Sequence, residues 1–265
     1  MDLIWSEECG ETYAIVTYDL AIAKPALQVQ AQESPIFDNI FICFGAFHIC
    51  MAYFNVLGYI IESSGCTDVL CSAEVLAQGS VRGFIAGKHF NRCRRIHPLF
   101  ALSLQILHFK QFLRRSGISE EYVALLNSFA TNQSPQSLST LLESPVICNL
   151  LEKYSDFCNQ TRQGSHGTNA RFWFIYIDLV HNYLVFDRAF RMNDLDLYTF
   201  ALGLMFPLLH NPNYARWMSL YHLNLLNMDM THPGIRSSFQ CVALSIRRSR
   251  HTFSRIAVDI TLEQT

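Results

Sequence analysis

The sequence predicts a mainly helical protein with a small α/β part. Half of its 265 residues are apolar and only 16% are charged, so the chain has enough apolar surface to fold around a core. Two short β-rich runs alternate with helical segments near the N-terminus, which is typical of an α/β unit. From residue 63 onward, apolar residues recur mainly at helical spacing. We therefore expect a partial α/β core beside a large helical region.

The first of three expected regions, residues 1–62, consists of a strand, a helix, a second strand and a second helix. These elements are predicted at 12–17, 20–32, 39–44 and 47–61. Pro25 either kinks the first helix or lies in its first turn, if that helix begins near Lys24.

Residues 40–61 have a second interpretation, because only His48 and Asn55 are polar among these 22 residues. The segment is long enough to span a membrane. However, Gly45 and His48 fall where a strand would turn into a helix, and no Lys or Arg flanks either end closely. A buried strand, turn and helix is therefore favoured, and we expect no transmembrane anchor.

The other two expected regions are helical. Residues 63–170 are interpreted as a helical insertion, with helices at 68–76, 80–85, 91–114, 120–130 and 137–157 and a polar linker at 161–169. The helix at 91–114 carries an apolar stripe of Leu99, Leu102, Ile106, Phe109 and Leu113. Residues 171–265 are interpreted as a helical stack, with helices at 172–191, 195–210 and 214–228 and a terminal strand at 253–260. Asp194 is expected to cap the second of these helices and Pro207 to kink it.

Charge and cysteine content narrow the functional classes. The formal net charge is −2 and the pI is about 6.5, so no global basic field marks a nucleic-acid-binding protein, and any such contact must be local. The nine cysteines are an odd number, and the acidic N-terminal residues do not resemble a secretion signal. We expect reduced cysteines and an intracellular protein.

Three side chains are candidates for a catalytic site. Asp19 directly follows the first β run, where α/β folds place ligand-binding groups, so it is a candidate ligand of Mg²⁺; alternatively, it only caps the next helix. His48 follows the second β run and either points toward Asp19 or is a hydrogen-bonded core residue. Asp178, among apolar neighbours on the helix at 172–191, either faces solvent or is a buried acid with perturbed ionisation.

Two local basic clusters are candidates for phosphate contacts. The first consists of Lys88, His89, Arg92, Arg94, Arg95 and His97, and the second of Arg236, Arg247, Arg248, Arg250, His251 and Arg255. Phe90 and Phe253 lie within them and are candidates for stacking on bases, whereas the alternative is a solvated face with paired carboxylates. A loose zinc pattern, C-x4-C followed by C-x3-H, is also present at Cys66, Cys71, Cys93 and His97.

Six strings, in one order along nearly the whole chain, resemble an uncharacterised family of long, transposon-associated proteins of animals and fungi. They are YDLAIAKPALQVQ (Tyr18–Gln30), FGAFHICMAYFNVLGYIIESSGCTDVL (Phe44–Leu70), GSVRGFIAGKHFNRCRRIHPL (Gly79–Leu99), FWFIYIDLVHNYLVFDRAFRMNDLDLY (Phe172–Tyr198), NYARWMSLYHLNLL (Asn213–Leu226) and IAVDITLEQT (Ile256–Thr265). The resemblance is weaker between Ser116 and Asn169.

The first two strings also resemble the core of ribonuclease H-like transposases. By this resemblance, Asp19 matches the middle metal-binding Asp and His48 matches the histidine after the following strand. Asp178 matches the final acid on the helix after the insertion, with Glu263 as its alternative. The resemblance implies a partial ribonuclease H-like core in which Asp19 and Asp178 bind Mg²⁺ for cleavage and joining of DNA strands.

The chain departs from that pattern before Asp19. About eighteen residues precede Asp19, too few for the hairpin and strand that carry the first metal-binding Asp, and Asp2 is a poor substitute. We therefore expect an internal piece of a longer protein that is catalytically inactive, because two-metal chemistry needs several carboxylates. The alternative hypothesis is a non-catalytic helical module that binds nucleic acid or protein. The expected partners are DNA and a second copy of the chain, which would associate through an exposed hydrophobic sheet edge or face. The nucleus is an expected location.

Overall fold

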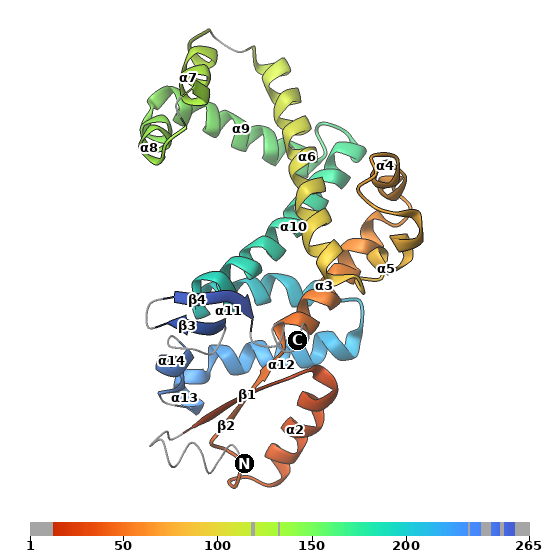
Figure 1. The fold of residues 1–265 in the computed structure, drawn as a ribbon, viewed down its shortest axis with the longest axis vertical. Coiled ribbons are helices and arrows are strands. Elements are labelled where there is room, and N and C mark those ends of the chain that lie inside the picture. The colour runs from red at the N-terminus through yellow and green to blue at the C-terminus, as the bar shows by residue number, and fades with distance from the viewer. Residues whose placement is uncertain are drawn as a thin grey trace. The chain divides into compact units, whose positions relative to one another are not determined.

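The computed structural model describes residues 13–117, 120–131, 133–232, 234–239, 245–249 and 252–257. These residues are mostly helical, with two small two-stranded sheets (Figure 1). The chain divides into two compact units: residues 1–96 and 181–265 form the first, and residues 97–180 form the second. This division differs from the expected boundaries after residues 62 and 170, because residues 63–96 pack with the first unit.

The first unit begins with a parallel β–α–β motif, as the sequence predicted. β1 (Ala14–Tyr18) pairs with β2 (Ile40–Phe44), from Ala14 opposite Ile40 to Tyr18 opposite Phe44, and α2 (Leu20–Gln32) connects the two strands (Figure 1). Pro25 lies inside α2 rather than in its first turn. Because the strands are parallel, their carboxyl ends meet at one edge of the sheet.

Helix α3 (Ala46–Ile61) follows β2 after Gly45 and forms the centre of the first unit. Its side chains Tyr53, Phe54 and Leu57 are 0% exposed. The interpretation of residues 40–61 as a buried strand and helix is therefore confirmed. Among the described residues, every helix is too short or too polar to cross a lipid bilayer.

Two glycines allow the next segment to approach α3 closely. The segment contains α4 (Cys66–Ser72), the 3₁₀ turn η1 (Gln78–Ser80) and α5 (Val81–Ile85). A Cβ atom on Gly58 would lie 2.0 Å from the carbonyl oxygen of Ile85, and one on Gly87 would lie 2.5 Å from that of Met51. Gly87 also has a φ of +70°, which glycine adopts without strain. These contacts hold the turn before α6 (Phe90–Ser116) against α3.

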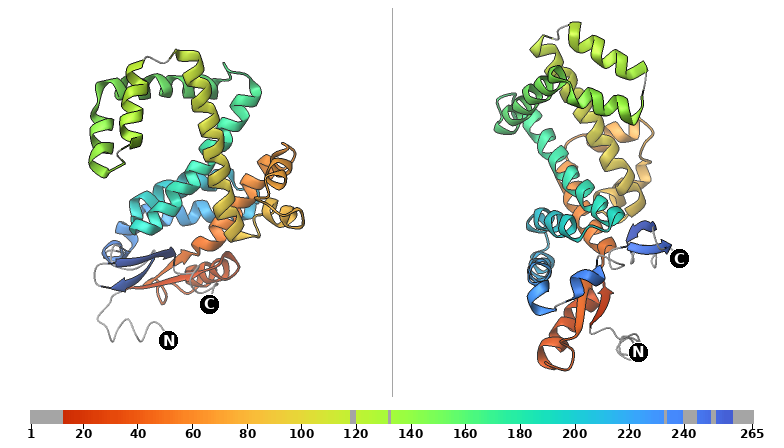
Figure 2. Two further views of the ribbon diagram at one scale, coloured as in Figure 1. Left: turned by 45° about the horizontal axis from the view of Figure 1, so that its top comes forward. Right: turned by 90° about the vertical axis from the view of Figure 1, so that its left-hand side faces the viewer.

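A stack of helices completes the first unit. It contains the end of α10 (Thr168–Met192), followed by α11 (Leu195–Met205), η2 (Phe206–Leu208), α12 (Pro212–Leu226), α13 (Met228–Thr231) and α14 (Ile235–Ser238). Helices α11 and α12 pack side by side (Figure 2). Asp194 caps α11 as predicted, accepting the Leu197 N–H at 2.9 Å. The expected kink at Pro207 is wrong: α11 ends at Met205, because proline lacks the N–H that would continue the helix.

The second unit combines parts of α6 and α10 with α7 (Glu120–Thr131), α8 (Pro135–Glu143) and α9 (Pro145–Gln163). Its core contains Phe112, Leu150 and Phe157. The single helix expected at 137–157 is two helices, because Pro145 begins α9 directly after α8. The linker expected at 161–169 is a short turn, since α9 extends to Gln163 before Gly164 ends it at a φ of +89°.

Helix α6 exists where predicted, but the first half of its apolar stripe faces the other way. Leu99, Leu102 and Ile106 are 56%, 53% and 46% exposed, so they do not form the core. Smaller and more polar residues are buried instead, notably His97 and Ala101. Burial here follows tertiary contacts rather than the highest local hydrophobicity.

A hairpin of two strands lies near the end of the chain. β3 (Ser245–Ser249) pairs antiparallel with β4 (Thr252–Ala257). The sequence predicted a strand at 253–260 and missed β3.

Candidate functional site

Asp19 and His48 follow neighbouring strands at the same edge of the parallel sheet. Asp19 lies between β1 and α2, and its Oδ1 accepts the Ile22 N–H at 2.9 Å, so the carboxylate caps α2. His48 lies in the first turn of α3, with its ring edge-on to Phe47 at 5.2 Å between centroids. The predicted strand-end positions are correct, and the capping alternative for Asp19 is the one observed.

Asp178 belongs to the second unit and forms an ion pair with Arg162. Its two carboxylate oxygens accept hydrogen bonds from Arg162 Nε at 2.8 Å and Arg162 Nη2 at 2.9 Å. The same guanidinium lies 4.8 Å from the centroid of the Phe174 ring. Hydrogen bonding to Asp178 raises the pKa of Arg162, so the guanidinium stays charged.

These carboxylates do not fit Mg²⁺ in their present arrangement. A hard cation needs free carboxylate oxygens, whereas both oxygens of Asp178 bind Arg162 and one oxygen of Asp19 binds a backbone N–H. In the part of the chain that is described, no three His, Cys, Asp or Glu side chains are grouped to hold a metal ion. Glu263, the alternative final acid, lies outside the described residues.

Three side chains of the loose zinc pattern, Cys66, Cys93 and His97, are buried. Burial raises the pKa of the Cys66 and Cys93 thiols to about 12, so neither is a thiolate near neutral pH. The Cys93 thiol donates to the Phe84 carbonyl at 3.5 Å. His97 is fully buried and shares a 2.8 Å hydrogen bond with the Tyr176 hydroxyl. Cys93 and His97 therefore each have a hydrogen-bond partner within the chain.

Some side chains of the first basic cluster are exposed, and others are buried or paired with carboxylates. Lys88, Arg92 and Arg95 are exposed, and among the described residues none of them is paired with a carboxylate; we call these three residues the basic face. Arg92 and Arg95 are three residues apart on α6, which places them on one side of the helix. His89 lies next to them, with its Nδ1 at 3.1 Å from Arg92 Nη1.

Three residues expected in this cluster have other roles. Arg94 Nη2 lies 3.7 Å from an oxygen of Asp187, which Arg191 also binds at 2.6 Å. Phe90 is only 6% exposed and packs on Phe47 at 4.8 Å, so it is not accessible for base stacking. Burial lowers the pKa of His97 to about 3, so this residue adds no positive charge near neutral pH.

The second basic cluster is described only in part. Arg236 bonds to Asp196 and, at 3.1 Å, to Asp229, so its charge is offset. The backbones of Arg247 and Arg248 lie in β3 and that of Arg255 in β4. Arg250 and His251 lie outside the described residues.

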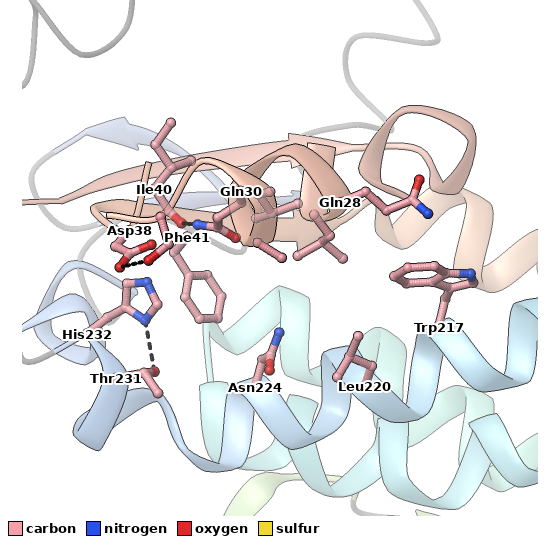
Figure 3. A pocket seen from close by; sticks show the side chains of 14 residues that line it. Gln28, Gln30, Asp38, Ile40, Phe41, Trp217, Leu220, Asn224, Thr231 and His232 are labelled. Atoms are coloured by element: carbon pink, nitrogen blue, oxygen red, sulfur yellow. Dashed lines mark hydrogen bonds between the residues drawn. The ribbon is translucent and has the colours of Figure 1, made fainter. Parts of the chain in front are cut away.

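Sequence reasoning missed a groove of about 710 Å³ between α2 and α12 in the first unit (Figure 3). Leu27 of α2, Phe41 of β2 and Trp217 and Leu220 of α12 form its apolar walls. At one end, His232 shares a 2.8 Å hydrogen bond with the Thr231 hydroxyl. No local sequence pattern predicts the groove, because its walls come from segments almost two hundred residues apart.

A hydrogen-bonded group of side chains in the second unit was also missed. His108 Nε2 and His166 Nδ1 each lie 2.8 Å from the Thr161 hydroxyl oxygen, and His108 Nδ1 lies 3.1 Å from the Tyr154 hydroxyl. Burial, helped by the charges of His166 and Arg162, lowers the pKa of His108 to about 4. The histidine is therefore neutral near pH 7, and the group stabilises the junction of α6 and α9.

Residues 4–265 match the model of a family described as "Domain of unknown function (DUF8702)". The chain belongs to this family. No curated protein and no solved structure is a match for it. The description of the DUF8702 family names no activity, so a function must be inferred from the side chains themselves.

Proposed function

We propose that this DUF8702 protein is a non-catalytic nucleic-acid-binding protein of transposase-type ancestry, and that its basic face binds phosphates. The supporting observation is a segregation of charge along the chain. Residues 75–119 contain eight Lys or Arg residues and no Asp or Glu, although the whole chain has a net charge of −2. Such a basic stretch provides the local field that phosphate binding requires.

The distribution of exposed cations favours phosphate over an ordinary solvated surface. Solvated helices usually intersperse acids and bases, whereas α6 has cations at both ends and no carboxylate of its own. The basic face lies at its start, and Lys110, Arg114 and Arg115 are exposed near its end. The turn containing Gly87 is held against α3, so Lys88 and the start of α6 are supported by the core of the first unit.

The proposed lack of catalysis is supported by the hydrogen bonds of Asp19 and Asp178. Metal-dependent cleavage needs several carboxylates free to hold two ions, but Asp178 is bound by Arg162 and Asp19 caps α2. The ancestry is supported by the parallel β–α–β motif, which places Asp19 and His48 at one sheet edge. Incubation of labelled DNA with the protein and Mg²⁺ or Mn²⁺ should give no cleavage. Cleavage that disappears in the Asp19→Asn variant would instead support an active nuclease.

Salt dependence tests the binding proposal. We expect fluorescence anisotropy to detect binding to a labelled DNA duplex at low salt, with an affinity that falls steeply as salt rises, because bound phosphates release counterions. Replacing the basic face with Lys88→Gln, Arg92→Gln and Arg95→Gln should weaken binding at least about tenfold and reduce the salt slope by about 1 for each lost contact. A single-stranded probe of equal length tests the preferred nucleic acid.

A matched variant controls for net charge. Lys153, Arg171 and Arg188 are exposed cations on α9 and α10, and their replacement by Gln changes the charge by the same amount. This control should bind DNA nearly as well as the natural chain. Equal losses in both triple variants, or no binding at low salt, would contradict the proposed basic face.

A further inference from the structure

The outer edge of strand β1 has a backbone that is open to a further strand. The Ala14 N–H donates to the Asn39 carbonyl at 2.9 Å, so Ala14 directs its polar backbone groups toward β2. Because these groups alternate in direction along a strand, Ile15 and Thr17 direct their N–H and carbonyl groups away from β2. Among the described residues, none forms a hydrogen bond with the backbone of Ile15 or Thr17. This edge therefore offers two N–H donors and two carbonyl acceptors to another strand.

The outer edge of β2 is protected in ways that the edge of β1 is not. Gln30 Nε2 donates to the Ile40 carbonyl at 2.6 Å, and the Ile40 N–H donates to the Phe37 carbonyl at 3.1 Å. Residues 41–44 of β2 are buried, whereas all five residues of β1 are partly exposed. β1 also contains no charged residue, proline or bulge, which are the features by which edge strands avoid pairing. Strand addition is therefore favoured at β1.

The small sheet that carries this edge is already packed against helices. Helix α2 packs on both strands, and the Phe41 ring of β2 contacts the rings of His232 and Phe239 at 5.2 and 5.6 Å between centroids. Parallel sheets usually have covered faces and contain more than two strands. A strand added at β1 would therefore join a supported sheet, and only the incoming segment would have to become ordered.

The charge around β1 indicates which kind of strand fits. Residues 1–62 contain eight Asp or Glu residues and one Lys. Four of these acids precede β1 within residues 1–12, and Asp19 directly follows the strand. A basic segment is attracted to this acidic region, whereas a second copy of the same region is repelled. The charge therefore disfavours the second copy that the sequence suggested as a partner of the sheet edge.

We infer that the outer edge of β1 binds an extended segment of another polypeptide, with uncharged β-branched residues at its centre and Lys or Arg at its ends. The backbone groups of Ile15 and Thr17 bond to the backbone of this segment, as in other cases of strand addition. Its β-branched side chains pair with those of Ile15 and Thr17 across the strands. The edge belongs to a different element from the basic face, so this inference does not depend on the proposed phosphate contacts.

Amide hydrogen exchange of the full chain, followed by NMR, tests the inference with a peptide of alternating Val and Thr that carries Lys residues at both ends. Without peptide, the Ile15 and Thr17 N–H groups should exchange rapidly, whereas the Val16 N–H, which faces β2, should be protected. Excess peptide should slow exchange at Ile15 and Thr17 at least about tenfold and change Val16 little.

The same peptide methylated on every backbone nitrogen is the control, because it keeps the charge but cannot pair as a strand. It should give no protection. Slow exchange at Ile15 and Thr17 without peptide, no protection by excess peptide, or equal protection by both peptides would overturn the inference.

A matched pair of variants at Thr17 connects peptide binding to the β1 edge. Thr17→Pro removes an outward N–H but no hydrogen bond to β2, whereas Thr17→Val keeps the N–H and the β-branched shape. Fluorescence anisotropy of the labelled peptide should show an affinity at least about tenfold weaker for Thr17→Pro and within about threefold of the natural chain for Thr17→Val. Thermal unfolding confirms that both variants fold.

Sedimentation without peptide tests the alternative occupant. The natural chain should not self-associate through β1, so Thr17→Pro should leave its sedimentation unchanged. Self-association that Thr17→Pro abolishes would assign the edge to a second copy and overturn the proposed partner. Equal peptide affinities of the two Thr17 variants would likewise overturn the inference.

Discussion

The two units differ in the histidines that their cores contain. Both units pack aromatic rings on each other, for example Phe54 against Tyr183 at 4.7 Å between centroids in the first and Phe112 against Phe157 at 5.5 Å in the second. The second also places His97 and His108 between its helices, where burial lowers the pKa of His97 to about 3 and that of His108 to about 4. An aromatic core depends mainly on filled volume, whereas a core with neutral histidines also depends on protonation. The two units should therefore unfold under different conditions.

The largest effect is expected in the aromatic core of the first unit. Phe54 is 0% exposed and touches both Tyr183 and Phe90. Phe54→Ala should lower the free energy of unfolding by about 3–5 kcal/mol, because it loses buried area and leaves a cavity. Denaturant unfolding measures this loss. Ile22→Ala removes an exposed side chain and should cost less than about 0.5 kcal/mol, so equal losses would contradict the assignment of the core.

Acid should destabilise the second unit before the first. Burial lowers the pKa of His97 to about 3, while an unfolded histidine titrates near 6.5. Between these values the unfolded chain binds a proton that the folded chain does not, so the contribution of His97 to the free energy of unfolding decreases as the pH falls and levels off below pH 3. His97 alone accounts for at most about 4–5 kcal/mol of this loss.

Amide hydrogen exchange measures the loss of structure in each unit separately as the pH falls. Amides of α6, α9 and α10 around His97 and His108 should lose protection in acid before those of α3. The variant His97→Asn should show a weaker pH dependence over the same range, even if its overall stability is lower, because it lacks the titrating imidazole. Parallel loss of protection in both units would show that the histidines do not distinguish them.

Sequence patterns predicted the local elements of the first unit well. The run from residue 40 to residue 61 contains a β-rich segment, then Gly45, then helical spacing, and the structure follows it as β2 and α3. Asp19 sits between a strand and a helix, so its position at a strand end could be read directly. The role of Asp19 could not be predicted, because a helix cap and a metal ligand both require an acidic residue at this position.

Tertiary contacts explain what the sequence did not predict. The stripe of Leu99, Leu102 and Ile106 is more hydrophobic than the face containing His97, yet His97 is buried, since its partner Tyr176 lies 79 residues further along the chain. The groove between α2 and α12 similarly depends on pairing distant helices. The partner of Asp178 was not predicted either: Arg162, from the preceding helix, binds both of its oxygens.

The smallest expected changes in the free energy of unfolding come from replacing one carboxylate in each unit. Asp19→Asn should change the free energy of unfolding by less than about 0.5 kcal/mol, because an amide oxygen caps α2 as well as a carboxylate does. Asp178→Asn should cost about 0.5–1 kcal/mol, since it weakens a partly exposed ion pair with Arg162, and added salt should reduce this difference. Thermal unfolding of both variants, with Mg²⁺ and with a chelator, measures the comparison. If Asp19 held a divalent ion, its variant would lose stability only in Mg²⁺ and would exceed the loss at Asp178; equal behaviour in both buffers is what a helix cap requires.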